Sequence, residues 1–205
     1  MLSRRGWQRS AGVCGLLSPV LTLTMILAAV ARSPWFNWQT NALSDLGVSE
    51  NAVWFNSALI IGAALNGVLA LGLGAWLGRG RLARLALAVL LLSAAALALI
   101  GVFTEAYGAV HWYVAAAYFL LTPVALLLAG VAMWQQGLRA LGALSICAGV
   151  AAFLTITMTP ADGLAVPEIL TATITGCWTF TMGMTLLLGP PAPSTAIESI
   201  TCTKE

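Results

Sequence analysis

The chain has 205 residues, of which 60% are hydrophobic and 8% are charged, and its mean hydropathy is +0.94. Soluble globular domains carry about 25% charged residues, so this composition excludes a soluble domain and places the chain in a bilayer. The formal net charge of +2, with no basic patch among aromatic residues, gives no support for a nucleic-acid partner.

Six apolar runs of about 20 residues are each long enough to cross the roughly 30 Å hydrocarbon core of a bilayer. They lie near residues 11–31, 54–77, 82–103, 109–133, 138–158 and 165–188. We therefore predict one all-α domain over residues 1–189, an integral-membrane bundle of six transmembrane helices. The proline-rich stretch after Gly189 cannot continue a helix, so residues 190–205 are predicted to be a disordered tail.

Lysine and arginine predict the orientation, because cytoplasmic loops carry an excess of them. Eight of the nine lie before the first run, after the second or fourth run, or in the tail, and Arg32 alone lies on the other side. Both termini are therefore expected on the cytoplasmic side of the inner membrane. The first run, with Ala29-Val30-Ala31 at its end, also fits a cleavable signal peptide, whose removal would leave five spans.

The connection from Arg32 to Val53 is aromatic and too apolar for a free loop. Tryptophan prefers positions where its ring is buried and its N–H stays near water. We therefore expect this segment, which contains Trp35, Phe36 and Trp38, to fold onto the membrane surface as a short amphipathic helix. It would cover the outer side of the bundle.

Asp45 lies in this connection, within the stretch Asn41-Ala42-Leu43-Ser44-Asp45-Leu46-Gly47. Two interpretations stay open. Asp45 caps the start of a helix with help from Ser44 or Asn41, or it is a buried acid. In the second case, desolvation favours the protonated carboxyl, which can act as a general acid.

The turn between the third and fourth runs carries Glu105 and His111, six residues apart. A loop allows these two side chains to meet, and a neutral imidazole there could exchange a proton with the acid. The alternative is a paired contact with no catalytic role. Tyr118 lies two helical turns beyond His111 on the same helix face.

Acidic residues concentrate on one side of the predicted bundle. Five of the seven fall in connections that reach this side, namely Asp45, Glu50, Glu105, Asp162 and Glu168. A carboxylate beside hydrocarbon is costly to keep ionised unless it faces water or finds a partner. This side is therefore the predicted functional site.

Two features lie deeper in the predicted membrane. Asn66, near the middle of the second run, is the polar residue most in need of a partner. On the last run a stripe at three-four spacing either packs the bundle or lines a cavity, in which Trp178 would present an aromatic face. This stripe comprises Thr171, Thr175, Trp178, Met182 and Thr185.

Four stretches carry a family resemblance: residues 41–47, Phe55-Asn56 with the apolar run into Gly62, residues 101–105, and His111. With them the chain resembles the small six-helix prokaryotic membrane proteins catalogued as domain of unknown function 998. It departs from that pattern at Thr104, where the pattern has proline, and at Ile169, where an arginine follows the glutamate. The resemblance implies fold and topology but no reaction.

Eight tryptophans, several near carboxylates, favour a chemistry in which an aromatic face stabilises a cation that a neutral acid creates. In size, span number and tryptophan content the chain also resembles small integral-membrane terpene cyclases. We therefore predict a membrane enzyme that acts on an isoprenoid or lipid substrate, with proton-initiated terpene cyclisation as the specific reaction. The alternative is a non-catalytic lipid-binding or assembly protein. A proton-coupled transporter fits less well, because no internal repeat is visible.

The predicted catalytic residues are Asp45 or Glu105 as the acid and His111 as the residue that sets its protonation. The predicted substrate-binding residues are Trp38, Asn41, Trp54, Asn66, Trp112, Tyr118, Glu168 and Trp178. One histidine and four scattered cysteines supply no metal-ligand spacing, so neither a metal nor a cofactor is predicted. The expected partners are a membrane-soluble prenylated or lipid substrate and the membrane lipids.

Overall fold

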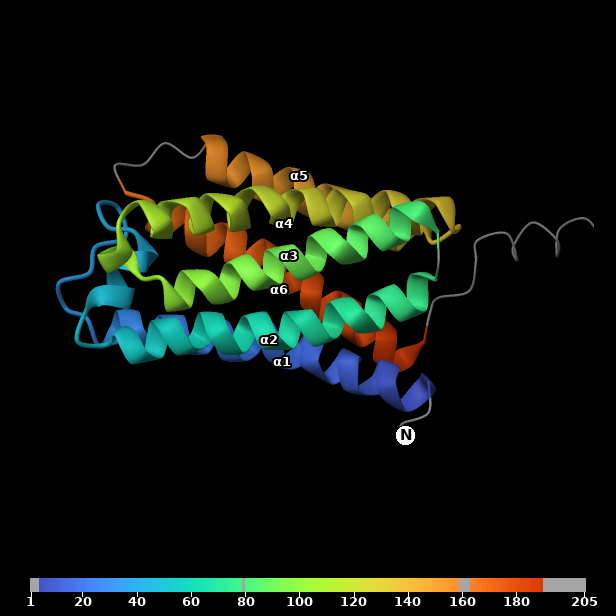
Figure 1. Cartoon of the computed structure of the whole chain (residues 1–205), viewed down its shortest axis with the longest axis horizontal. Helices are drawn as coiled ribbons and strands as arrows, with labels where there is room; N and C mark the ends of the chain where they lie inside the picture. Colours follow the sequence, from blue (N-terminus) through green and yellow to red (C-terminus); the bar gives the residue numbers. More distant parts are fainter. Residues whose placement is uncertain (1–3, 79, 159–162, 190–205) are drawn as a thin grey trace, which may run out of the picture.

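The computed structural model describes residues 4–78, 80–158 and 163–189 (Figure 1). Its long helices are α1 (Arg4–Ala31), α2 (Ala52–Leu77), α3 (Arg81–Val102), α4 (Ala109–Gln135), α5 (Arg139–Met158) and α6 (Ala165–Leu188). Two short 3-10 helices, η1 (Leu43–Val48) and η2 (Glu105–Tyr107), lie in the connections. All six long helices are long and apolar enough to cross a membrane. The predicted all-α bundle of six membrane spans is thus confirmed, while the predicted tail and Asp162 lie outside the described residues.

The helices form a closed ring in chain order. Each long helix packs against its neighbours in sequence, and α6 returns to pack against α1. Because the number of spans is even, the start of α1 and the end of α6 lie at the same end of the bundle (Figure 1). The connections 32–51, 103–108 and 163–164 meet at the other end, which we call the loop pole.

Glycines allow neighbouring helices to approach closely. A Cβ atom on Gly183 of α6 would lie 2.7 Å from the carbonyl oxygen of Gly12 on α1. Between α4 and α5, a Cβ atom on Gly130 would lie 2.9 Å from the carbonyl oxygen of Gly142. Small residues at such crossings are how membrane helices gain packing energy without a hydrophobic driving force. These contacts hold the ring together at two of its seams.

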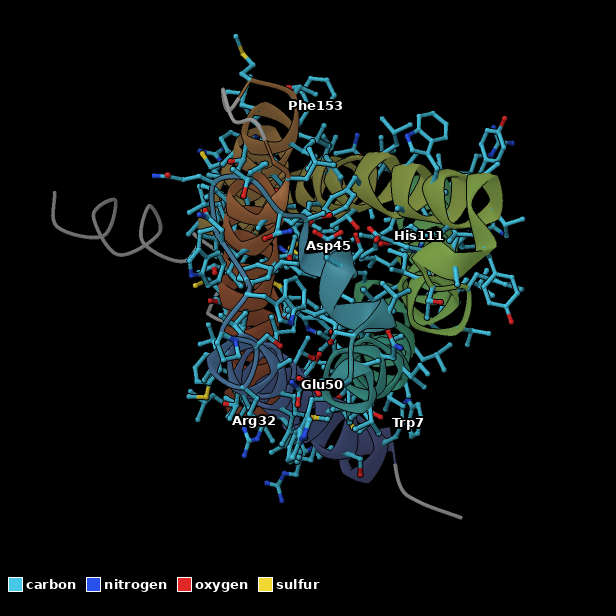
Figure 2. All side chains as sticks on the ribbon, turned by 90° about the vertical axis from the view of Figure 1, so that its left-hand side faces the viewer. Trp7, Arg32, Asp45, Glu50, His111 and Phe153 are labelled. Atoms are coloured by element: carbon cyan, nitrogen blue, oxygen red, sulfur yellow. The ribbon has the colours of Figure 1, made fainter. Side chains whose placement is uncertain are left out.

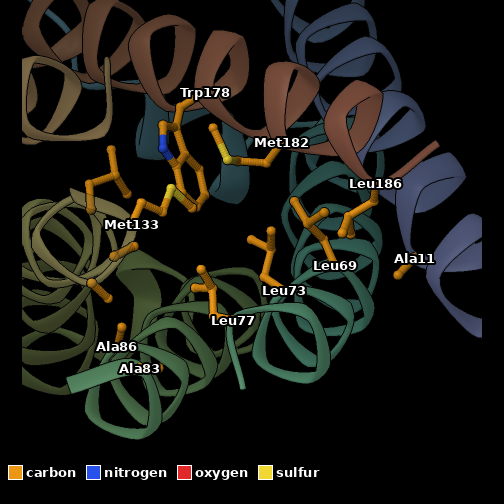
Figure 3. Packing of buried hydrophobic residues seen from close by; sticks show 13 residues of the cluster. Ala11, Leu69, Leu73, Leu77, Ala83, Ala86, Met133, Trp178, Met182 and Leu186 are labelled. Atoms are coloured by element: carbon orange, nitrogen blue, oxygen red, sulfur yellow. The ribbon is translucent and has the colours of Figure 1, made fainter. Parts of the chain in front are cut away.

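Two clusters of buried side chains fill the ring. In the cluster farther from the loop pole, Trp178 and Met182 of α6 face Leu69 and Leu73 of α2, and Met133 of α4 packs beside them (Figure 3). Burial of aliphatic and aromatic surface between helices replaces lipid contacts with tighter van der Waals packing. This cluster therefore ties α6 to the opposite side of the ring.

The second cluster lies at the loop pole and includes the connection between α1 and α2. Leu43 and Leu46 of η1 are 4% and 0% exposed and pack with Phe55 of α2 and Ala165 of α6. Trp35 in the same connection is 45% exposed. The segment therefore inserts η1 into the mouth of the ring and leaves part of its aromatic surface outside.

Candidate functional site

The loop pole brings together side chains from three separate connections. Viewed along the bundle axis, Asp45 of η1 and His111 of α4 lie near the middle of the ring, and Arg32 lies at its rim (Figure 2). Glu105 begins η2, and Glu168 lies in the first turn of α6. Each of these acids has its own hydrogen-bond partners.

Residues 43 and 44 of η1 bind two acids from opposite sides of the ring. The hydroxyl of Ser44 donates a hydrogen bond of 2.6 Å to Oε1 of Glu105. The backbone N–H of Leu43 donates one of 2.7 Å to Oε2 of Glu168. Because both donors belong to consecutive residues, the two carboxyl groups are held on either side of one short helix.

Asp45 accepts hydrogen bonds from two residues of its own connection. Its Oδ2 atom accepts hydrogen bonds from the side-chain amide of Asn41 (2.7 Å) and from the backbone N–H of Ala42 (3.1 Å). Such a contact satisfies a donor that the start of a helix leaves free. The capping interpretation therefore describes these contacts. Asp45 also lines a shallow outer depression with Trp35 and Glu50.

Burial is the main cause that raises the pKa of Glu105 above its ordinary value of 4.5. The neighbouring carboxyl of Asp45 also raises this pKa, through a side-chain hydrogen bond with Glu105 and because two like charges disfavour each other. The hydrogen bond from Ser44 and the charge of His111 act in the opposite direction. Glu105 consequently retains its proton to higher pH than an exposed glutamate.

His111 is 8% exposed and has a defined tautomer. Its Nδ1 atom lies 2.7 Å from the carbonyl oxygen of Phe103. A carbonyl oxygen can only accept a hydrogen bond, so Nδ1 must carry the proton. In the neutral ring, Nε2 is then the nitrogen that can accept a proton. Glu105 and His111, predicted as a pair, act on each other through charge, while their hydrogen bonds go to Ser44 and Phe103.

Glu168 lies at the loop pole without an arginine beside it. Arg32 is the one arginine at this pole among the described residues, and its guanidinium donates to the Ala28 carbonyl and lies 4.8 Å from the Trp54 ring centre. The position after Glu168 holds Ile169. An ionised carboxylate is costly to bury without a cation, so the neutral acid is the form that this position accommodates at lower cost.

A partly open cavity of about 120 Å³, the axial cavity, is lined by some of these groups. Its polar end is formed by Ser44, His111 and Glu168. Its walls come from α1, α2, α3, α4 and α6, and the aromatic residues among them are Phe55, Tyr118, Phe119 and Trp178. A proton donor thus lies on the wall of an apolar, aromatic-lined space.

Trp178 has its polar atom satisfied away from this space. The residue is 3% exposed, and its indole Nε1–H donates a hydrogen bond of 2.8 Å to the hydroxyl of Ser145 on α5. A buried indole N–H needs such an acceptor. With the N–H bonded to α5, the ring contributes aromatic surface to the cavity wall.

The predicted site residues separate into two groups. Glu168, His111, Asn66, Tyr118 and Trp178 line the axial cavity. The lining residues do not include the other predicted site residues, which are Asp45, Glu105, Asn41, Trp38, Trp54 and Trp112.

Three of the four tryptophans that were predicted to bind substrate do not line the axial cavity. Trp54 and Trp112 are 39% and 65% exposed, as expected for rings at a membrane interface, and Trp38 packs against the loop-pole cluster. Phe55 and Phe119, which the sequence analysis did not select, take their place in the cavity wall. Both stand in continuous apolar runs, where the sequence gives no signal of which side faces inward.

No group of three His, Cys, Asp or Glu side chains in residues 4–78, 80–158 and 163–189 is arranged to hold a metal ion.

Comparison with known proteins identifies one family. The family described as "Protein of unknown function (DUF998)" matches residues 16–185 of the chain. Searches of curated proteins and of solved structures found no significant match. The matched range contains all the acids of the described loop pole and every residue that lines the axial cavity.

Proposed function

We propose a function from the site itself, because the chain belongs to the DUF998 family and that membership assigns no reaction. The protein is an integral-membrane enzyme that transfers a proton to an isoprenoid or other lipid chain held in the axial cavity. One observation carries this proposal: Glu168, with no arginine beside it, lies on the wall of a mostly apolar cavity whose lining includes four aromatic rings.

The proposed reaction begins at Glu168. Its carboxyl O–H gives a proton to an alkene carbon of the substrate, so the π electron pair forms the new C–H bond and the other carbon becomes a cation. The aromatic faces of Tyr118 and Trp178 stabilise this cation. A second alkene of the same chain then supplies the electron pair for a C–C bond that closes a ring. Ring closure leaves a new cation, and a carbon next to it loses a proton to the Glu168 carboxylate. This step forms a new alkene and restores the acid, so the product is an isomer of the substrate.

The volume of the cavity limits what this reaction can form. A cavity of about 150 Å³ is known to bind a molecule as small as benzene, and the axial cavity measures about 120 Å³. It is therefore too small for a folded polycyclic product. We accordingly limit the proposed cyclisation to one ring, formed at the end of the chain nearest Glu168.

The proposed location is the inner membrane, with both termini in the cytoplasm and the loop pole outside. This orientation follows from eight of the nine lysine and arginine residues, which lie in segments at the opposite end of the bundle. Between turnovers, Glu168 would then exchange its proton with water on the extracytoplasmic side.

The test uses membranes that contain the full-length protein, incubated with prenyl alcohols in deuterated water. Isomers of the substrate that carry deuterium at carbon are expected with the wild type. Glu168→Gln keeps an acceptor for the Leu43 N–H but has no acidic proton, so turnover is expected to fall by about 100-fold or more. Glu50→Gln, at an exposed carboxylate of the same pole, is the matched control and should retain activity.

Two results would reject parts of this proposal. Full activity in Glu168→Gln would exclude Glu168 as the acid, and Asp45→Asn would then test the acid predicted first. Binding of prenyl alcohols without deuterium incorporation would reject catalysis. It would favour the alternative, a non-catalytic lipid-binding protein that uses the same narrow cavity.

A further inference from the structure

We propose that Asn66 binds an oxygen atom carried on the substrate chain, at a point deep in the axial cavity. The substrate would thus be a membrane-soluble chain with a polar group at the loop pole and a second, hydrogen-bond-accepting oxygen, such as a ketone, farther along. This inference rests on the proposed role of the cavity as a chain-binding site, and it adds a requirement on the chemistry of that chain.

Within the part of the chain that the structure describes, the side-chain oxygen of Asn66 is hydrogen-bonded to the protein, and its side-chain nitrogen is not. The hydroxyl of Ser18, which is 2% exposed, donates a hydrogen bond of 2.9 Å to Oδ1 of Asn66. The amide nitrogen Nδ2, with its two N–H donors, has no protein acceptor among the residues that the structure describes. Because Asn66 lines the axial cavity, this free donor is available to a bound molecule.

The other polar side chains of the cavity wall at this depth differ from Asn66. Each of their hydroxyl groups is bonded to an oxygen of the protein: Ser93 with the Thr122 hydroxyl, Thr175 to the Thr171 carbonyl, Thr179 to the Gly176 carbonyl and Thr22 to the Ala58 carbonyl. A donor left without an acceptor in an apolar interior is costly. The unpaired amide of Asn66 therefore requires an acceptor, which a ligand oxygen can supply.

The depth of Asn66 in the bundle follows from its position along α2. Phe55 lines the cavity and belongs to the loop-pole cluster, and Asn66 follows it by 11 residues on the same helix. At 1.5 Å per residue, Asn66 lies about 16 Å farther along the axis. It is near the middle of α2, at a depth where a bilayer supplies no water to satisfy polar groups.

The shape of the cavity selects the kind of molecule that can reach both points. A volume of about 120 Å³ that extends over this length is narrow, and its wall between the polar points is mostly aliphatic and aromatic. A slender, extended chain matches this shape better than a bulky molecule. Its first polar group would meet Ser44 or Glu168, and an oxygen farther along the chain would accept a hydrogen bond from Asn66.

The experiment measures binding to the purified full-length protein in lipid nanodiscs, without any need for turnover. The probes are a long-chain primary alcohol and a series of the same alcohol with one keto group at successive positions. In the wild type, one ketone of the series is expected to bind about 10-fold more tightly than the plain alcohol, as one added hydrogen bond allows, and ketones at distant positions are not. The infrared C=O band of this ketone should shift to lower frequency on binding.

Two variants separate Asn66 from the rest of the chain. Asn66→Leu, of similar size, should abolish both the affinity difference and the band shift. Thr173→Val, at an exposed threonine of α6 that does not line the cavity, should preserve both. The position series in the wild type tests the inference even if a variant does not fold.

Equal affinity for all probes would overturn the inference, as would a ketone preference that persists in Asn66→Leu. A preference for a hydroxyl over a ketone at this position would also overturn it, because the cavity would then present the amide oxygen instead of the N–H. These failures are distinct from failure of the proposed function, since the turnover of Glu168→Gln measures the acid at the other end. If no probe binds, the inference and its premise of a bound chain both fail.

Discussion

Glu168 and Asp45 carry the same functional group at the same pole, yet their hydrogen bonds differ. Asp45 accepts bonds from Asn41 and Ala42 of its own connection, which ties the carboxylate to the start of η1. Glu168 accepts a bond from the distant Leu43 and lines the axial cavity. The Glu168 carboxyl therefore lies on the wall of the axial cavity, whereas the Asp45 carboxyl lies at the outer depression.

Glu105→Gln is expected to remove part of the pH dependence of stability. Burial and the Asp45 carboxyl raise the pKa of Glu105 in the folded protein above 4.5, so the folded state binds its proton more tightly than the unfolded state. The free energy of unfolding must then fall as pH rises from about 4.5 through the raised pKa. In Glu105→Gln this decrease should be weaker, as measured by unfolding midpoints in detergent across a pH series.

The matched control for this prediction is Glu50→Gln, which removes an exposed carboxylate from the same pole. It should leave the pH dependence close to that of the wild type. A decrease in stability of unchanged size in Glu105→Gln would show that another group is responsible.

Ser145→Ala is expected to destabilise the bundle through Trp178. Ser145 is fully buried and is the acceptor for the indole N–H of Trp178, so alanine leaves that N–H unpaired in an apolar surrounding. The cost of an unsatisfied buried donor is about 1–3 kcal/mol. Unfolding by sodium dodecyl sulfate titration measures this cost. Thr181→Val serves as the control, because Thr181 is partly exposed and its hydroxyl bonds within its own helix. An equal loss there would contradict the assignment to Trp178.

At the scale of elements, the connection between α1 and α2 is attached to the start of α6. Gly163 N–H donates to the Gln39 carbonyl (2.8 Å), and Ala165 N–H donates to the Asn41 carbonyl (2.9 Å). Together with the bond from Leu43 to Glu168, these contacts position η1 over the polar end of the cavity. The position of Glu168 thus depends on how the connection docks.

Gly163→Ala is expected to loosen this docking. A Cβ atom at Gly163 would lie 2.5 Å from the carbonyl oxygen of Asn41, which is backbone and cannot rotate away. Crowding of this kind costs about 1–3 kcal/mol. Hydrogen exchange at the Leu43 amide should become faster. Gly67→Ala is the control, since no atom lies within 4 Å of a Cβ there and alanine favours a helix; equal exchange rates in the two variants would contradict the docking role.

The sequence predicted the elements well for a physical reason. Each span must be apolar over its whole length, and Gly or Pro marks its ends, so the predicted runs fall within a few residues of α2 to α6. α1 begins earlier than predicted, at Arg4, because a helix can continue into polar residues beyond the apolar run. The conformation of residues 41–47 was less predictable, since η1 depends on acceptors from α6 and η2 that are distant in the chain.

At the scale of the whole molecule, a ring of membrane helices hides its interior from sequence analysis. In water, the inward face of a helix is the apolar one, but in a bilayer the outward face is apolar as well. Phe119 and Tyr118 are neighbours in the cavity wall, and nothing in their run distinguishes them from the exposed Leu120. Asn66 and Glu168, which interrupt apolar runs, were therefore among the residues that indicated the cavity wall.

Orientation is the remaining property of the whole molecule, and it decides with which compartment Glu168 would exchange its proton. Arginines at the end opposite the loop pole predict that this end is cytoplasmic. In a variant without native cysteines, a membrane-impermeant maleimide added to intact cells should label Glu50→Cys, at the exposed loop pole, and should not label Gln135→Cys, at the exposed end of α4. Permeabilised cells should label both, which controls for reactivity. The reverse pattern would place the acids on the cytoplasmic side, and Glu168 would then exchange its proton with water on that side.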